Sequence, residues 1–219
     1  MHSINVKYFS MRTFYVCSYG GSGSYMLARY LCKYGKVHHV HSRNPPQKVC
    51  NVGKAKTHHT NEVYFEWFDE NNPIQDPCQH SVVFIYRSPV PVIYSRCGMP
   101  AHLKNIQCNA NITIQDVVNS SSDLYGLEEF FDNYTQCEVA YDIVCVKYET
   151  VFDSFANLDA ALNIPSRSDA WPTRKETIRA HPRANALSAI YAGLIAKIES
   201  MPPIHVVRAC SQNKTATHL

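Results

Sequence analysis

The 219-residue sequence contains no apolar run near the length of about 18 residues that a membrane-spanning helix needs. Its first residues lack the apolar core of a secretory signal peptide. It also lacks any long run of lysines and arginines, and its formal net charge at pH 7 is only +3. We therefore expect a soluble, cytoplasmic protein with no membrane span and no nucleic acid among its partners.

The nine cysteines are irregularly spaced, and none forms a CxxC motif, which favours reduced thiols over a disulfide framework. Three histidines, His38, His39 and His41, lie in an alternating, strand-like stretch. No cysteine or acidic residue stands at the spacing that structural zinc sites use, so we expect no metal. These histidines instead become candidates for the border of an acceptor pocket.

Apolar runs and helix-like patterns alternate along the chain. We expect strands near 13–17, 37–41, 51–57, 82–86 and 142–147, and helices near 24–34, 61–70, 89–97, 124–138, 150–162 and 184–200. This alternation predicts an α/β fold, a single domain over residues 1–219 with a parallel β-sheet flanked by helices on both faces. The stretch 101–123 is the least regular, and it predicts either a lid or acceptor wall or a plain surface connection.

A glycine-rich loop joins the first expected strand to the first expected helix. Three glycines stand among small hydroxyl residues, and the candidate anion-binding residues are Tyr19, Gly20, Gly21, Ser22, Gly23, Ser24 and Tyr25. A glycine-rich turn at a helix N-terminus presents free backbone N–H groups at the positive end of the helix dipole. The loop therefore predicts a phosphate site, although a plain strand-to-helix turn would have a similar sequence.

Neither common nucleotide signature accounts for this loop. A Walker motif needs a lysine and then Ser or Thr after its last glycine, whereas Ser24 and Tyr25 follow Gly23. The dinucleotide fingerprint GxGxxG fails on spacing.

Two later segments carry basic residues of a kind that suits group transfer. In an extended strand, Lys56 and His58 project to the same side, where a histidine can accept a proton and a lysine can stabilise a leaving oxygen. An exposed basic strand end would have the same pattern. The second segment places Arg87 at the end of a buried strand, with Ser88 and Pro89 as the start of a helix and Ser95 about two turns along it. Arg87 and Ser95 are thus candidates to share an anion.

These segments together resemble the sulfotransferases that use 3′-phosphoadenosine-5′-phosphosulfate (PAPS). Ser22-Gly23-Ser24 is similar to the core of the family's 5′-phosphosulfate loop, and Lys56-Thr57-His58 is similar to its Lys-Thr-His segment. Arg87, Pro89 and Ser95 reproduce its 3′-phosphate segment, and Tyr148-Glu149 resembles its strand ending in Tyr-Glu. The matches occur in the family's order over residues 13–150.

The resemblance implies a P-loop-like sulfotransferase architecture and the transfer of a sulfuryl group from PAPS to a hydroxyl or amine. His58 would be the catalytic base and Lys56 would stabilise the departing bisphosphate. Tyr148 would contact the cofactor. The family's late basic segment has its nearest candidates in Arg174, Lys175 and Arg179. The acceptor class is left open between small molecules, lipids and glycans, and the oligomeric state is also open.

One departure from the family keeps two other functions open. Gly21 stands where the family has a loop lysine, and losing such a donor typically costs about 10²–10³ in rate. Lys56 and the loop amides would have to supply that role, or the chain would bind nucleotide without catalysis. A P-loop kinase-like phosphotransferase is the third alternative, disfavoured by the absence of the GK[ST] sequence.

Overall fold

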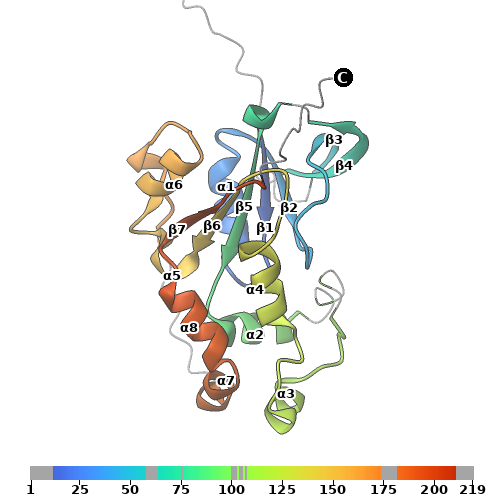
Figure 1. Ribbon diagram of the computed structural model, residues 1–219, viewed down its shortest axis with the longest axis vertical. Coiled ribbons are helices and arrows are strands. Elements are labelled where there is room, and N and C mark those ends of the chain that lie inside the picture. The colour runs from blue at the N-terminus through green and yellow to red at the C-terminus, as the bar shows by residue number, and fades with distance from the viewer. Residues whose placement is uncertain are drawn as a thin grey trace, which may run out of the picture.

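The computed structural model of the chain describes residues 12–57, 64–74, 76–99, 103, 106, 108–173 and 182–210. Within these residues, strands and helices alternate around a central sheet (Figure 1). The strands are β1 (Arg12–Cys17), β2 (Gly35–Val40), β3 (Cys50–Thr57), β4 (Tyr64–Pro73), β5 (His80–Tyr86), β6 (Ile143–Lys147) and β7 (Ile204–Val207). The helices are α1 (Ser24–Leu31), α2 (Pro89–Cys97), α3 (Ile114–Ser120), α4 (Leu127–Thr135), α5 (Tyr148–Val151), α6 (Phe155–Ala161), α7 (Ala184–Ile190) and α8 (Ala192–Ser200).

The central sheet has five strands in the order β2-β1-β5-β6-β7. The first four are parallel, and β7 pairs antiparallel with β6 through Ile143↔Val207. Side chains of β5 alternate between the two faces, so Phe84 packs into one core and Ile85 into the other. A sheet covered on both faces needs apolar residues at nearly every position, and all seven residues of β5 are buried.

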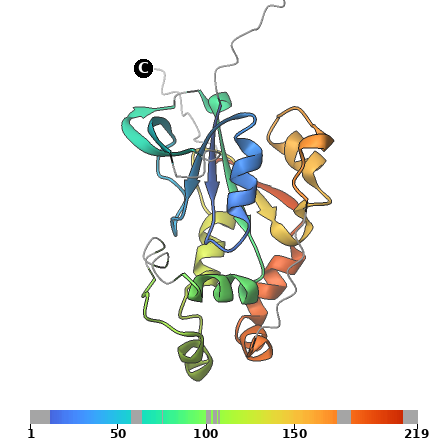
Figure 2. The ribbon, with the colours of Figure 1, turned by 180° about the vertical axis from the view of Figure 1, so that it is seen from behind.

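Helices cover both faces of the sheet. On one face, α4 packs against β5, where Tyr134 stacks on Phe84 with ring centroids 4.3 Å apart. The other face is covered by α1, α5 and α6 (Figure 2). Beyond the carboxyl ends of the parallel strands lie α2, α3, α7 and α8 (Figure 1). The predicted α/β fold, with helices on both faces of the sheet, is therefore confirmed, and the sheet is parallel except for β7.

One expected element is wrong, and another forms as expected but in a different sheet. The helix expected near 61–70 is instead the strand β4, and β3 pairs antiparallel with β4 in a separate two-stranded sheet rather than joining the parallel one. Residues 64–68 read Tyr-Phe-Glu-Trp-Phe, and aromatic residues favour strands over helices. Pairing with the strand next to it in the chain needs no crossover, which explains why a hairpin forms here.

Three further differences are smaller. The irregular stretch 101–123 contains α3, which begins with a capping box formed by Thr113 and Asp116. The long helices expected over 150–162 and 184–200 are each broken into two, the second at Tyr191. Both halves of the second segment nevertheless pack into the core, since Leu187, Leu194 and Ile198 are buried.

Candidate functional site

The glycine-rich loop follows the carboxyl end of β1, the strand between β2 and β5 in the sheet. Its three glycines have positive φ angles of 96°, 69° and 80° at Gly20, Gly21 and Gly23, and Gly23 is the N-cap of α1. Only glycine adopts this left-handed conformation at low cost. Among the described residues, no backbone–backbone hydrogen bond is donated by the amides of residues 20–26. The loop therefore offers a run of N–H groups at the positive end of the α1 dipole.

Each of these glycines makes room for a side chain from another segment. A Cβ atom at Gly20 would lie 0.8 Å from Nη2 of Arg96, and one at Gly23 would lie 2.3 Å from Cε2 of Tyr148. At Gly21, a Cβ would lie 2.8 Å from Cβ and 2.9 Å from Oγ of Ser95. The loop backbone is thus packed directly against α2 and against the start of α5.

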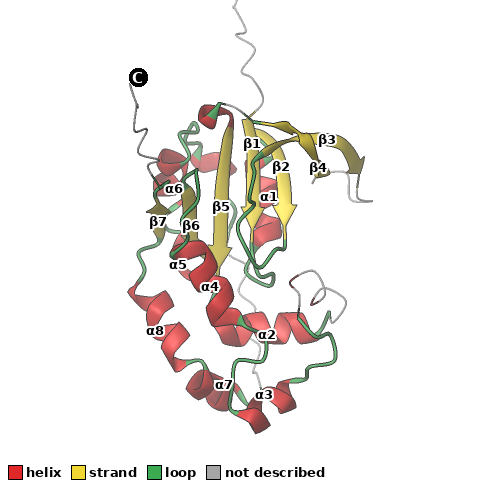
Figure 3. Ribbon diagram, turned by 45° about the vertical axis from the view of Figure 1, so that its right-hand side comes forward, coloured by secondary structure: helices red, strands yellow, loops and turns green. Residues whose placement is uncertain are grey.

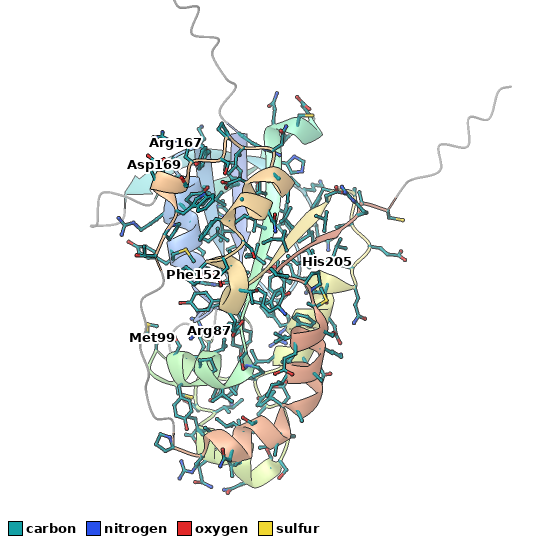
Figure 4. The ribbon with its side chains drawn as sticks, turned by 90° about the vertical axis from the view of Figure 1, so that its left-hand side faces the viewer. Arg87, Met99, Phe152, Arg167, Asp169 and His205 are labelled. Carbon is teal, nitrogen blue, oxygen red and sulfur yellow. The ribbon has the colours of Figure 1, made fainter. Side chains whose placement is uncertain are left out.

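Arg87 and Ser95 both reach this loop. Nη1 of Arg87 lies 3.5 Å from the carbonyl oxygen of Gly21, and its guanidinium carbon lies 4.4 Å from the centroid of the Tyr148 ring. The Arg87 side chain lies between the carboxyl edge of the sheet and α2 (Figure 4). Its Nε is buried and has no hydrogen-bond partner among the described residues. The structure thus brings Arg87, Ser95 and Tyr148 together around the glycines.

Helix α2 begins where the sequence predicts, with Ser88 as the N-cap and Pro89 as the first residue. The Ser88 hydroxyl makes no cap hydrogen bond; its backbone N–H instead donates to a carboxylate oxygen of Glu149 at 2.8 Å. This bond ties the start of α2 to α5, the helix that carries Tyr148.

Arg96 is a site residue that the sequence reasoning missed. It lies in the last turn of α2 and is only 2% exposed, and its Nε and Nη1 have no hydrogen-bond partner among the described residues. Burial lowers the pKa of Arg96, while the neighbouring Tyr19 acts in the opposite direction. The signal was available, because positions 89, 92, 93 and 96 form one helical stripe and the first three are apolar.

Two histidines of the predicted cluster lie beside the loop. His39, in β2, has its Nε2 2.8 Å from the hydroxyl of Ser24, the first residue of α1. Burial, followed by the neighbouring His41, His38 and Arg96, lowers the pKa of His39 to about 3, so its ring is neutral at physiological pH. The rings of His39 and His41 are 4.5 Å apart, and Nδ1 of His41 lies 3.0 Å from the carbonyl oxygen of Ser18.

The other predicted loop residues have separate surroundings. The Tyr19 hydroxyl donates to the carbonyl oxygen of Tyr125 at 3.0 Å, so its side chain belongs to the core. Ser22 is buried, and its hydroxyl donates to the carbonyl oxygen of Gly20 at 3.3 Å. Tyr25 is 44% exposed on the surface of α1.

The structure does not bring the predicted Lys56 segment to the loop. Lys56 lies on β3, and this strand and its partner β4 extend from the sheet at the end opposite the glycine loop (Figure 3). His58 lies outside the described residues, as do Arg174, Lys175 and Arg179. The proposed roles of these four residues therefore remain predictions from the sequence.

A cavity of about 300 Å³ lies beside Ser88, the residue that follows Arg87. This volume is at the lower end of the range for small-molecule binding sites. Its walls are Ser88, Lys147, Glu149 and Thr150, together with Ile195, Ile198 and Glu199 of α8. One carboxylate oxygen of Glu149 and the hydroxyl of Thr150 are buried there without a hydrogen-bond partner among the described residues. The cavity thus combines apolar walls with polar groups that a ligand can satisfy.

The described residues contain no group of three or more His, Cys, Asp or Glu side chains placed to hold a metal ion. No helix within them is both long enough and apolar enough to cross a membrane. In comparisons with known proteins, no family profile matches this chain, and no curated protein or solved structure matches it significantly.

Proposed function

We propose that the chain is a PAPS-dependent sulfotransferase that transfers a sulfuryl group to an acceptor hydroxyl or amine. The observation that supports it best is the packing of Arg87 and Ser95 against Gly21 of the glycine loop. This arrangement offers two anion-binding elements side by side, and a nucleotide with phosphates at both its 3′ and 5′ positions needs two.

In this proposal, the loop amides hold the 5′-phosphosulfate, and Arg87 and Ser95 hold the 3′-phosphate. Tyr148 contacts the nucleotide, and the neighbouring cavity beside Glu149 is the place for further parts of it. The acceptor oxygen attacks sulfur as the bond between sulfur and the 5′-phosphate oxygen breaks. The acceptor proton passes to His58, and 3′,5′-adenosine bisphosphate leaves. General-base catalysis of this kind typically contributes about 10²–10⁴ in rate.

The identity of the base can be tested by comparing two histidines. His58 carries the role by sequence, whereas His41 is the histidine beside the loop that also contacts Ser18. We expect His58→Ala to reduce the release of bisphosphate from PAPS, measured over a panel of phenols, amines and glycans, by at least 100-fold. We expect His41→Ala to change it by less than tenfold. If His58→Ala still binds bisphosphate and turns over at the wild-type rate, the proposed mechanism is wrong.

A second function is favoured by a specific observation. Gly21 stands where a loop lysine is expected, and β3, which carries Lys56 and directly precedes His58 in the sequence, extends from the sheet at the end opposite the loop. These features suit a protein that binds the nucleotide without turning it over. Tight bisphosphate binding with no turnover on any acceptor of the panel would support this alternative.

A further inference from the structure

We propose that Arg96 binds an anionic phosphate or sulfate group directly at the glycine loop. This inference deepens the proposed function, and it rests on that function only in requiring an anion at the loop. Neither the motifs of the sequence nor the proposed mechanism gives Arg96 a role.

The first argument is the burial of the charge. Arg96 is 2% exposed, yet it takes part in no ion pair among the described residues, and two of its guanidinium nitrogens lack hydrogen-bond partners there. An unpaired buried charge costs several kcal/mol, so a protein rarely keeps one without a partner that arrives later. That partner has to be negatively charged.

The second argument is the position of the guanidinium. Nη2 of Arg96 occupies the space that a side chain at Gly20 would fill, so the group lies directly against the loop backbone. The amides of residues 20–26 donate no backbone–backbone hydrogen bond among the described residues. A tetrahedral anion held by these amides would lie close to the Arg96 guanidinium, which can donate two parallel N–H bonds to it.

The third argument is the charge of the surroundings. Burial is the main cause of the lowered pKa of His39, followed by His41, His38 and lastly the positive charge of Arg96, so Arg96 adds to the positive field on the β2 side of the loop. Arg87 contributes a second guanidinium on the β5 side. A bound anion would neutralise this positive field, and Arg96 would supply a cation where Gly21 supplies none.

The test compares Arg96→Met with Arg43→Met. Methionine fills a similar volume without the charge. Arg43 is also largely buried, but its charge is paired: Nη1 forms an ion pair with Glu129 at 3.0 Å and donates a hydrogen bond to the carbonyl oxygen of Gly126 at 3.0 Å. Inorganic pyrophosphate and 3′,5′-adenosine bisphosphate are titrated calorimetrically at constant ionic strength, and each apo protein is also unfolded in urea.

We expect Arg96→Met to weaken binding of pyrophosphate by about 10- to 100-fold, the range for hydrogen bonds to a charged group. Its apo form should unfold at the same or a higher urea concentration than wild type, because an unpaired charge has been removed. Arg43→Met should show the reverse, with a lower urea midpoint and an unchanged Kd.

Three results would overturn the inference. They are a wild-type protein that does not bind pyrophosphate, an Arg96→Met protein that binds it as well as wild type, and an Arg96→Met protein that fails to fold. If Arg96-dependent pyrophosphate binding is found but the bisphosphate binds no better than ADP, the inference holds and the proposed function fails. The two failures are therefore distinguishable.

Discussion

Gly21→Ala should destabilise the protein strongly, because two costs act at one position. The backbone there has φ +69°, a conformation that costs a residue with a Cβ about 1–2 kcal/mol. The new methyl would also lie 2.8 Å from Cβ of Ser95, an atom fixed to the α2 backbone, so the helix or the loop must shift. Overpacking of this kind typically costs about 1–3 kcal/mol. The two costs together predict that Gly21→Ala lowers the free energy of unfolding by about 2–5 kcal/mol.

The assay is urea denaturation followed by circular dichroism, with Gly98→Ala as the matched control. Gly98 has φ −72°, and the atom nearest to its missing Cβ is the Ser95 carbonyl oxygen at 3.6 Å, an ordinary contact. We expect the control to change the free energy of unfolding by less than about 0.5 kcal/mol. Equal stability of Gly21→Ala and wild type would refute the close packing of the loop on α2. The same contact indicates that a lysine at position 21 would not fit without displacing Ser95.

Two further predictions concern buried polar groups. Asp159 is fully buried and accepts hydrogen bonds from the Tyr30 hydroxyl and, at 3.1 Å, from Nε1 of Trp171. Asp159→Ala leaves both donors unpaired, so it should lower the free energy of unfolding in urea by about 2–4 kcal/mol. A decrease of less than about 0.5 kcal/mol would contradict this hydrogen-bond network. The pKa of His39 is about 3 in the folded protein, below its value in the unfolded chain. Its contribution to stability is therefore fully present above pH 6.5. As the pH falls below 6.5, this contribution declines by at most about 1.4 kcal/mol per pH unit, because the unfolded chain binds a proton that the folded protein does not. His39→Gln should therefore lose stability less steeply between pH 6.5 and 4, and identical slopes would show that His39 is not buried and neutral.

The sheet was predictable wherever a strand is buried on both faces. The apolar run of β5 and the apolar lead into the glycine loop at β1 have no other reasonable interpretation, and both strands form as predicted. Strand β3 was predicted, but β4 was incorrectly predicted as a helix, because residues 64–68 mix aromatic and acidic side chains without a clear period. The edge strand β7 was missed because it has only four residues, none of them fully buried.

The part of the site that depends only on the spacing of residues in the sequence was predictable. The glycines, Arg87 and Ser95 stand at spacings that place them together once the strand and helix are known. Arg96 was not found, since a charge in the sequence is ordinarily assigned to the surface, and only the folded structure shows that it is buried without a partner. The remote position of β3 also could not be predicted, because it depends on which strand it pairs with.

The most direct test of the proposed function is the calorimetric Kd of 3′,5′-adenosine bisphosphate, compared with those of ADP and ATP–Mg²⁺, in wild type and Arg87→Ala. A ligand at 100 times its Kd would also stabilise the fold by about 2.7 kcal/mol, which a thermal melt can verify. Our account predicts that the bisphosphate binds at least tenfold more tightly than ADP and that Arg87→Ala removes this preference. No binding of the bisphosphate, or tighter binding of ATP–Mg²⁺, would contradict the account and favour a kinase-like site.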